Sequence, residues 1–324
     1  MVKIEMKLSV FVVTYNQEKY IRQCLDGILM QNVDFDYEIV IGEDHGTDGT
    51  RAICEEYAQK YPQVRLLPLT ENLGVVKNWF RTISACDGEY VALCEGDDYW
   101  TDENKLKEQV RFLDSNKDCS LVYGTSKLLY EATGEYTDRS TAECWQGDVF
   151  QYMLGNNFVL PLSAMFRKNA MMEAIRVMKE SVPEEHWKTA DYPLFLTLAR
   201  LGKFGYIPHS YGVYRVLASS VSNTGDKKKN AEFRESMLYI TDLFRKMYLQ
   251  DGGKISKEQK RYICNKIIYR SLIVCELYRE LKMKRKFYHR FFASFRSTAN
   301  FTDIKTLLKY YLCYLFGKKT IYGI

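Results

Sequence analysis

The sequence predicts an α/β protein in which a mostly parallel sheet is sandwiched by helices and followed by a basic helical appendage. In the first hundred residues, short β-branched apolar runs alternate with segments whose apolar residues recur at helical spacing. The connectors between these segments are short, as in sheets whose strands are joined by crossover helices. From Lys227 onward the pattern is helical, with no proline and no strand pattern.

The alternation begins with Leu8–Thr14 (LSVFVVT), a continuous apolar run typical of a strand buried on both faces. Ile21, Leu25 and Ile28 recur at helical spacing within a helix predicted over Glu18–Met30. The alternation continues with strands at Tyr37–Gly42, Val64–Leu69 and Tyr90–Cys94 and helices at Thr47–Tyr61 and Val75–Ala85.

The second half of the chain is predicted to be less regular. Its helices are expected at Glu103–Asn116, Asn169–Lys179 and Asp191–Leu201, and its strands at Ser120–Tyr123 and Phe204–Arg215, with a hairpin over Ser126–Tyr136. The run Lys227-Lys228-Lys229 marks a boundary. We therefore expect two domains, residues 1–226 and residues 227–324.

Charge divides the chain at the same point. Residues 1–226 carry 23 Lys and Arg against 33 Asp and Glu, whereas residues 227–324 carry 23 against 8. Over residues 285–319, basic residues interleave with Phe, Tyr and Leu. We expect this region either to contact an anionic membrane or to pack as helices on the first domain or in a homodimer. The acidic first domain argues against a nucleic-acid partner.

Composition also bears on the compartment. Nine scattered cysteines without a CxxC pair are typical of buried thiols in a reducing compartment. The sequence opens without a secretory signal pattern, and no window reaches the roughly 18 apolar residues of a membrane span. We therefore expect a cytoplasmic protein, either free or peripheral at the inner face of the plasma membrane.

Three polar loops follow the first, second and fourth predicted strands, at Thr14–Glu18, Glu43–Gly49 and Glu95–Trp100. Ligands of open α/β sheets bind at the carboxyl ends of the strands, where such loops converge. The sequence therefore predicts a ligand site at this edge of the sheet.

The loop Glu95-Gly96-Asp97-Asp98 collects acidic residues that repel one another unless a cation neutralises them. Carboxylate oxygens suit Mg²⁺ or Mn²⁺, which bind one or two carboxylates together with substrate phosphates. Such a metal would stabilise a diphosphate leaving group. A helix N-cap at Thr101 or Asp102 accounts for only part of this polarity.

Asp44 ends the second predicted strand. Its carboxylate is placed either to accept a hydrogen bond from a nucleotide base or to cap the next helix. Thr47 and Asp48 can already cap this helix, which favours binding of the nucleotide base as the role of Asp44. Tyr15, beside Thr14, is a candidate for stacking on the base, and packing is the alternative.

Four motifs occur in one order, namely SVFVVTYNQEKYI, EIVIGEDHGTDGT, ENLGVVKNWF and GEYVALCEGDDYW. They closely resemble those of the bacterial family 2 glycosyltransferases, which have the GT-A fold. The resemblance is strong over residues 7–124 and looser over residues 147–222. It implies a nucleotide-diphosphate sugar donor, with a UDP-sugar favoured.

The resemblance also implies roles for single residues. Thr14, Tyr15 and Asp44 match nucleoside-binding positions, with Glu18 close by. Lys77 is expected to approach a phosphate or sugar oxygen of the donor. The remaining matches are Asn72, Gly74 and Asn78 beneath the donor, and Asp97 and Asp98 in a DXD-type motif that touches ribose, sugar and metal.

The resemblance assigns the catalytic base to Asp191, which would take the proton of the acceptor hydroxyl. An N-cap of the following helix is the alternative, and both roles are compatible. One base with in-line attack implies inversion at the anomeric carbon. The chain departs from the family at Leu217, where many relatives carry a His that helps to bind the metal. Either Asp98 and water suffice, or another residue such as His209 or Arg215 substitutes.

The sequence therefore predicts an inverting hexosyl- or N-acetylhexosaminyltransferase that acts on a saccharide or lipid-linked saccharide in cell-surface polysaccharide biosynthesis. One alternative is another nucleotide-sugar transferase, although Thr14–Glu18 lacks the glycines of a phosphate loop. The other alternative is a non-catalytic nucleotide-sugar-binding module, which the residues Glu95 and Leu217 keep open.

Overall fold

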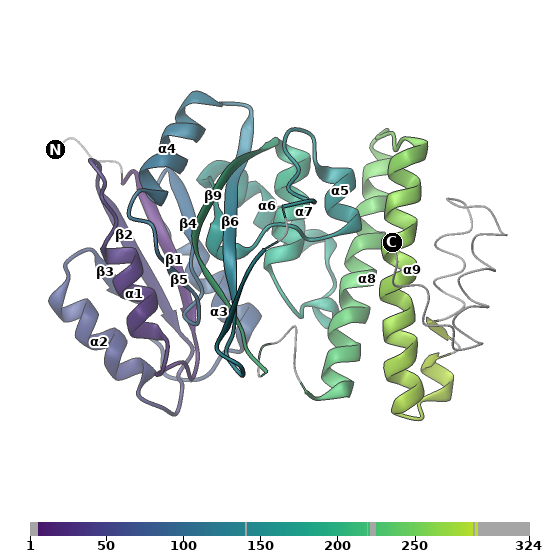
Figure 1. Ribbon diagram of the computed structural model, residues 1–324, viewed down its shortest axis with the longest axis horizontal. Coiled ribbons are helices and arrows are strands. Elements are labelled where there is room, and N and C mark those ends of the chain that lie inside the picture. The colour runs from purple at the N-terminus through teal and green to yellow at the C-terminus, as the bar shows by residue number, and fades with distance from the viewer. Residues whose placement is uncertain (1–5, 140, 219, 221–224, 288, 291–324) are drawn as a thin grey trace. The chain divides into compact units, whose positions relative to one another are not determined.

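The computed structural model describes residues 6–139, 141–218, 220, 225–287 and 289–290 (Figure 1). Contacts divide the chain into two compact units. The first runs to Val149 and adds Asn157–Pro183 and Trp187–Leu217, and the second comprises Phe150–Asn156, Glu184–His186 and the residues from Ala218 on.

A sheet of nine strands organises the first unit within the described residues. Its parallel half has the order β3-β2-β1-β4 and consists of β1 (Leu8–Thr14), β2 (Tyr37–Glu43), β3 (Val64–Leu66) and β4 (Tyr90–Leu93). Leu8 of β1 is level with Tyr37 and with Tyr90, so the three central strands run in register toward one edge.

The other half makes the sheet mixed. Strand β8 (Ala164–Arg167) runs antiparallel to β4 and to β6 (Cys119–Tyr130), and β9 (Lys203–Val216) runs parallel to β6. The remaining strands are β5 (Tyr99–Trp100), antiparallel to β9, and β7 (Glu135–Asp138), antiparallel to β6.

Helices cover both faces of this sheet, which confirms the predicted α/β fold (Figure 1). On β1, Val10 and Val12 pack into a core shared with three helices, α1 (Ile21–Leu29), α2 (Thr50–Lys60) and α4 (Lys105–Ser115). On the opposite face, the ring centroids of Phe11 and Trp79 are 5.4 Å apart. The helices of that face are α3 (Val75–Ser84), α6 (Lys168–Ser181) and α7 (Asp191–Leu201).

Several predicted boundaries need correction. The strand predicted at Ser120–Tyr123 continues to Tyr130, because register shifts let β6 stay paired with β9 beyond its apolar run. The hairpin therefore turns between Tyr130 and Glu135. Strand β8 was missed because four residues are too few to show a period. Helices α1 and α2 begin three residues later than predicted, since polar loops hold the residues before them.

The described part of the second unit is helical. It contains α8 (Lys227–Gln250), α9 (Lys257–Glu280) and α5 (Phe150–Gly155). Lys227, which begins α8, pairs with Glu280, which ends α9, at 3.0 Å, so the two long helices are antiparallel. Ser256 and Gln259 form a capping box at the start of α9.

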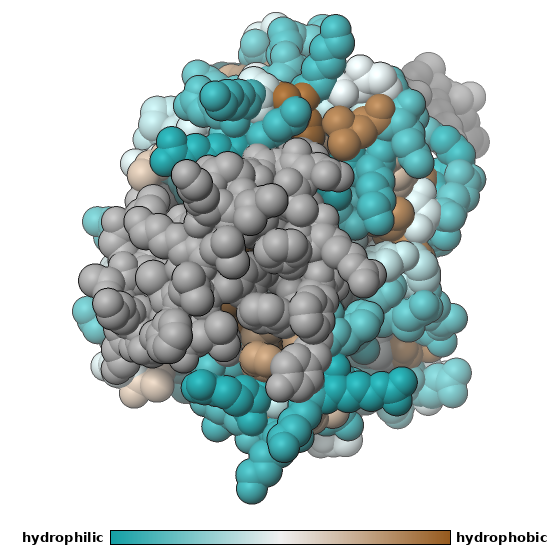
Figure 2. All heavy atoms as spheres, turned by 90° about the vertical axis from the view of Figure 1, so that its right-hand side faces the viewer, coloured by the Kyte–Doolittle hydropathy of each residue, from teal (hydrophilic) through white to brown (hydrophobic). Residues whose placement is uncertain are grey.

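The basic segment 285–319 lies mostly outside the described residues. In the ranges that are described, no helix combines the length and the apolarity that crossing a bilayer requires. On the face in Figure 2, the described side chains are mostly hydrophilic, with hydrophobic ones in small groups between them.

One lysine is fully buried in the first unit. Lys105, at the start of α4, is 0% exposed, and its Nζ donates a hydrogen bond to Gln109 Oε1 at 2.7 Å. The same Nζ lies 4.2 Å from the ring centroid of Trp100. Burial lowers the pKa of Lys105 to about 7, so the charged form is disfavoured in the folded protein.

We expect this lysine to make stability depend on pH. Between pH 7 and the ordinary lysine pKa, the unfolded chain binds a proton at Lys105 that the folded protein does not. The free energy of unfolding therefore rises with pH in this window, by at most about 1.4 kcal/mol per pH unit. Urea unfolding of the wild type and Lys105→Met at pH 7.0 and 9.5 isolates this contribution, because other groups titrate equally in both. Parallel pH dependences would contradict it.

Candidate active site

Three loops leave the parallel half of the sheet at one edge. The Asp44 N–H donates to the Thr14 carbonyl at 3.0 Å, and the Gly96 N–H donates to the Val13 carbonyl at 2.9 Å. The loops after β2 and β4 therefore flank the loop after β1. A Cβ at Gly96 would lie 2.7 Å from the Cβ of Thr14, so glycine is needed for this close approach.

Polar contacts fasten the loop after β1 to the loop after β2. Asn16 Oδ1 accepts the Thr47 N–H at 2.8 Å, and Glu18 Oε2 accepts the Gly49 N–H at 2.9 Å. Tyr15, which directly precedes Asn16, is 46% exposed. The Glu18 carboxylate thus holds the two loops together, whereas the Tyr15 ring is accessible to a ligand.

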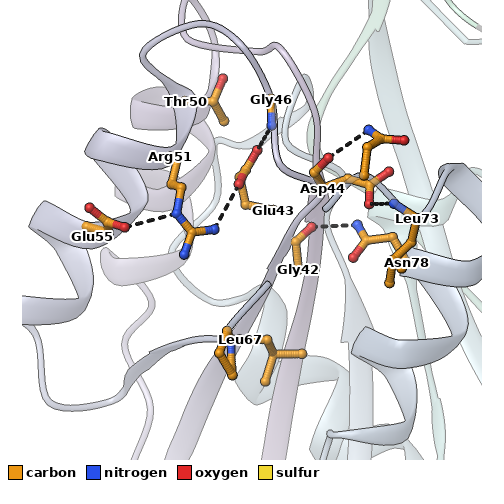
Figure 3. Close-up of polar contacts among 12 residues, drawn as sticks. Gly42, Glu43, Asp44, Gly46, Thr50, Arg51, Glu55, Leu67, Leu73 and Asn78 are labelled. Atoms are coloured by element: carbon orange, nitrogen blue, oxygen red, sulfur yellow. Dashed lines mark hydrogen bonds and ion pairs between the residues drawn. The ribbon is translucent and has the colours of Figure 1, made fainter. Parts of the chain in front are cut away.

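Two acidic side chains at the end of β2 order the neighbouring backbone (Figure 3). Glu43 is fully buried and accepts the Gly46 N–H at 2.6 Å. Asp44 is 3% exposed, and its Oδ1 accepts the Leu73 N–H at 2.9 Å. Asp44 does not cap α2, whose N-cap is Gly49. Its carboxylate instead positions the segment that leads into α3.

That segment and α3 together carry four of the candidate donor-binding residues, namely Asn72, Gly74, Lys77 and Asn78. Asn72 Nδ2 donates to the Asp44 carbonyl at 2.7 Å. Asn78 is 2% exposed, and its Nδ2 donates to the Gly42 carbonyl at 2.7 Å (Figure 3). Asn78 therefore ties α3 to β2. Lys77, one residue earlier, is exposed.

The acidic loop after β4 contains a buried carboxylate with an unused oxygen. Asp98 is 1% exposed, and its Oδ1 accepts the Arg215 N–H at 2.8 Å. Its Oδ2 is buried without a hydrogen-bond partner. Burial, and then the charges of Asp97 and Glu95, hold the pKa of Asp98 well above its usual range. Burial also raises the pKa of Asp97, which the neighbouring Gln17 side chain opposes.

Asp191 lies close to this loop, at the first residue of α7. Burial, and then the charges of Asp97 and Asp191, raise the pKa of Glu95 to about 8. Asp191 accepts a hydrogen bond from the Thr189 hydroxyl and one from Asn157 Nδ2, the latter at 3.3 Å. Burial raises its pKa as well. The N-cap position of α7 belongs to Ala190, so Asp191 is not the cap.

Arg215 fixes the end of β9 against the acidic loop. Its guanidinium pairs with Glu131 at 3.0 Å and donates to the Gln23 side-chain oxygen. It also lies 4.8 Å from the ring centroids of both Tyr20 and Tyr99. Arg215 therefore contributes its backbone N–H to Asp98, while its side chain joins α1, β5 and the β6–β7 turn.

A divalent cation fits the oxygen donors of the acidic loop. Among the described residues, no three His, Cys, Asp or Glu side chains form a preformed metal site. However, the unpartnered Oδ2 of Asp98 is a hard donor of the kind that Mg²⁺ and Mn²⁺ prefer, and Asp97 is adjacent. Leu217 is buried, and His209 pairs with Asp102 at 2.8 Å. Phosphate and water oxygens would therefore complete the coordination.

The structure thus gathers Thr14, Tyr15, Asp44, Asp97 and Asp98 at one edge, with Asp191 near the acidic loop through its effect on Glu95. Glu18 joins the loops after β1 and β2, and Asn78 joins α3 to β2. Gln17 and Asn157 are not recognisable as site residues from the sequence, because a lone amide carries no characteristic spacing.

Known proteins resemble this chain in sequence. Residues 9–174 match the family model described as glycosyl transferase family 2. An uncharacterised protein of Mycobacterium tuberculosis is 33% identical over 231 residues, which are 70% of this chain and 64% of that protein. EpsH of Bacillus subtilis, a candidate glycosyltransferase by its name, is 24% identical over 287 residues, which are 86% of this chain and 80% of EpsH. The chain thus spans under two thirds of the mycobacterial relative.

Solved structures share the fold. S. aureus TarS 1-349 in complex with UDP-GlcNAc has a TM-score of 0.56 and 20% identity, covering 84% of this chain and 83% of TarS 1-349. The mannosyltransferase PcManGT of Pyrobaculum calidifontis, in complex with GDP-Man and Mn²⁺, has a TM-score of 0.55 and 15% identity, covering 98% and 89%. These likenesses confirm the GT-A type of fold.

The Asp44 contact predicts a difference between two substitutions. Asp44→Ala leaves the Leu73 N–H without its acceptor and should lower the free energy of unfolding by about 1–3 kcal/mol. Asp44→Asn keeps an acceptor oxygen and should cost less. Urea unfolding of both variants without nucleotide measures the difference. If Asp44→Ala unfolds at the wild-type urea concentration, this contact does not order the segment before α3.

Proposed function

The chain belongs to glycosyl transferase family 2, and we propose that it is an inverting glycosyltransferase of cell-surface polysaccharide biosynthesis. It moves a hexosyl or N-acetylhexosaminyl group from a nucleotide-diphosphate sugar to a hydroxyl of a saccharide or lipid-linked acceptor. The observation that supports this proposal is the group of carboxylates after β4, which ends at the same edge as β1 and β2, where the charges of Asp97 and Asp191 both raise the pKa of Glu95.

The donor occupies the loops of the parallel half. Tyr15, which is exposed beside Thr14, stacks on the base, and Asp44 borders the nucleoside. Asp97 contacts the ribose or the donor sugar, and Lys77 reaches the phosphates from α3. A UDP-sugar is favoured, and the TarS complexes with UDP-GlcNAc and UDP support that choice.

In this proposal, Asp98 and Asp97 would hold a Mn²⁺ or Mg²⁺ ion. When bound, the ion supplies charge neutralisation for the leaving diphosphate. The Arg215 N–H fixes Asp98 Oδ1, which leaves Oδ2 for the cation. The complex of PcManGT with GDP-Man and Mn²⁺ supports divalent metal use on this fold.

Asp191 is the base of the reaction. The acceptor oxygen bonds to the anomeric carbon as the bond from that carbon to the diphosphate oxygen breaks, and the acceptor proton passes to Asp191. The Thr189 hydroxyl and Asn157 Nδ2 orient the carboxylate. Its raised pKa makes it a better proton acceptor than an ordinary aspartate. A single displacement inverts the anomeric configuration.

The two-domain division and the place of action are part of the proposal. Residues 1–226 form the catalytic domain, and residues 227–324 form a basic C-terminal region whose described part contains the helices α8 and α9. The excess of Lys and Arg in that region supports peripheral contact with an anionic membrane at the cytoplasmic face, where lipid-linked acceptors lie. Pairing of two copies through these helices is the alternative.

Removal of the metal-binding carboxylate should abolish nucleotide binding that depends on metal. We expect UDP with Mn²⁺ to stabilise the wild type by about 1–3 kcal/mol, because the complex forms only with the folded protein. Asp98→Asn should lose this stabilisation. Asp34→Asn, which removes an exposed carboxylate ahead of β2, should retain it. Thermal unfolding with and without Mn²⁺ measures both. Absence of any shift with UDP, GDP or dTDP in the wild type would favour a protein that binds no nucleotide.

Loss of the base should separate chemistry from donor binding. Asp191→Asn is expected to slow sugar transfer about 10²–10⁴-fold while its stabilisation by UDP and Mn²⁺ stays at the wild-type level. Thr189→Ala, which removes only an orienting hydrogen bond, should lose less. UDP release with a panel of saccharide acceptors measures the rate, and NMR of the product gives the anomeric configuration. Full activity in Asp191→Asn, or retained configuration, would contradict the mechanism.

A further inference from the structure

The segment that follows β3 forms a further loop at the edge where the donor is proposed to bind. Strand β3 runs parallel to β2, with Leu66 level with Ile41, so it ends at the same edge as β2 and β1. In the order β3-β2-β1, the loop after β3 and the loop after β1 lie on opposite sides of the loop after β2. Asp44, which follows β2, is therefore flanked by the loop of Tyr15 on one side and by residues 67–74 on the other.

Both ends of the loop after β3 are fixed by hydrogen bonds to the end of β2. The Leu67 N–H donates to the Ile41 carbonyl at 2.9 Å, and the Leu73 N–H donates to Asp44 Oδ1 at 2.9 Å (Figure 3). Residues 68–71, between these contacts, are exposed or partly exposed. The loop thus has two anchored ends and an accessible middle beside Asp44.

Arg81 of α3 holds the first part of this loop. Its Nη2 donates to the carbonyls of Leu67 and Pro68 at 3.2 and 3.3 Å. Its Nη1 donates to Asn78 Oδ1 at 2.8 Å, and Asn78 Nδ2 donates to the Gly42 carbonyl at 2.7 Å. Arg81 therefore joins the loop after β3 to the end of β2, with Asn78 as the link between them.

Close packing of α3 on β2 brings Arg81 within reach of the loop. A Cβ at Gly42 would lie 2.9 Å from the Cβ of Thr82 and 3.1 Å from Asn78 Oδ1, so a larger residue would push the helix away. Thr82 directly follows Arg81 in α3. The glycine of β2 thus sets the distance from which the guanidinium holds the two carbonyls.

The three acceptors of these Arg81 hydrogen bonds are neutral oxygen atoms, from one side-chain amide and two backbone carbonyls. Burial lowers the pKa of Arg81, and the nearby charge of Asp44 opposes this effect. A guanidinium stays charged in proteins and presents its N–H groups in a rigid planar fork. It can therefore fix successive carbonyls in one orientation, which the single amine of a lysine does less well.

A nucleotide base bound beside Asp44 would meet the middle of this loop. In the proposed donor complex, Tyr15 stacks on the base and Asp44 borders the nucleoside, so the base lies between the loop after β1 and residues 68–71. The backbone N–H and C=O groups of an exposed loop can bind a base only in the directions that the loop conformation gives them. A loop that is already fixed does not have to be ordered when the ligand binds, which raises affinity.

We propose that residues 68–71 form one wall of the base subsite for the donor nucleotide, and that Arg81 is the positioning residue that holds this wall. The inference rests on the proposed glycosyltransferase function, because its ligand is the nucleotide of that reaction. It separates two parts of donor binding. Arg81 acts on the base, whereas Asp98 acts on the diphosphate through the metal.

The test compares nucleotides with a matched ligand that lacks the base, by isothermal titration of the full chain with Mn²⁺. UDP, dTDP and GDP are titrated into the wild type, and the tightest of them is used for the variants. Ribose 5-diphosphate keeps the ribose and the diphosphate. We expect the wild type to bind the nucleotide at least about tenfold more tightly than ribose 5-diphosphate. Arg81→Gln should lose about tenfold in affinity for the nucleotide and less than about twofold for ribose 5-diphosphate.

Two further variants show whether the loop is responsible. Arg81→Lys keeps a cation with a poorer geometry, so its loss should lie between those of the wild type and Arg81→Gln. Thr70→Gly leaves Arg81 in place and loosens the exposed middle of the loop, so it should lower the affinity for the nucleotide by about threefold. Urea unfolding of each variant shows that it is folded, and Thr70→Gly tests the loop even where Arg81→Gln is not.

Arg65→Gln is the matched control. Arg65 also donates to a backbone carbonyl of α3, that of Ala85 at 2.6 Å, and it pairs with Glu38 at 2.8 Å. These contacts lie at the opposite end of β2 from Asp44. Arg65→Gln should therefore lower the free energy of unfolding while the ratio of the two affinities stays at the wild-type value.

The inference is overturned if Arg81→Gln loses equal affinity for both ligands, if Arg81→Gln or Thr70→Gly keeps the wild-type affinity for the nucleotide, or if Arg65→Gln changes the ratio as much as Arg81→Gln. A wild type that binds ribose 5-diphosphate as tightly as every nucleotide would also overturn it, while the metal–diphosphate site of the proposed function would stand. A wild type that binds neither kind of ligand with Mn²⁺ would overturn the proposed function and this inference together.

Discussion

The constraint on which the site depends is the crowding of carboxylates at the end of β4. Glu95, Asp97 and Asp98 share one loop, Asp191 adds a fourth charge nearby, and burial raises the pKa of each. Ionised carboxylates in such a loop repel one another, and a bound cation offsets this repulsion. The surrounding backbone serves to hold it in place, as the N–H of Arg215 on Asp98 illustrates.

Much of the support for this loop comes from groups that do not themselves meet a substrate. Arg215 lies between two tyrosine rings and pairs with Glu131, so the end of β9 cannot shift without breaking several contacts. Gly96 permits its backbone to lie close to the Cβ of Thr14. Catalytic geometry needs such a supporting layer, because a small displacement of a carboxylate weakens its interaction with a substrate or a metal.

The sequence predicts the parallel half well and the other half poorly, for physical reasons. Strands β1, β2 and β4 are buried on both faces, so their apolar runs are long and unbroken, and polar loops at their ends are conspicuous. Strand β8 has only four residues, and β6 continues through polar positions because it stays paired with β9. The proximity of Asp191 to Glu95 depends on tertiary folding across nearly a hundred residues, which local patterns do not contain.

The fastening of the first two loops bears on the entropy of ligand binding. Asn16 and Glu18 accept hydrogen bonds from the backbone of the neighbouring loop, and Asp44 does the same for the segment before α3. These segments are ordered when the chain folds, so a nucleotide that enters between them does not have to order them again. The loops on this side of the site lose their conformational entropy when the chain folds, so nucleotide binding there does not have to include that loss. The site for the nucleotide is therefore preorganised.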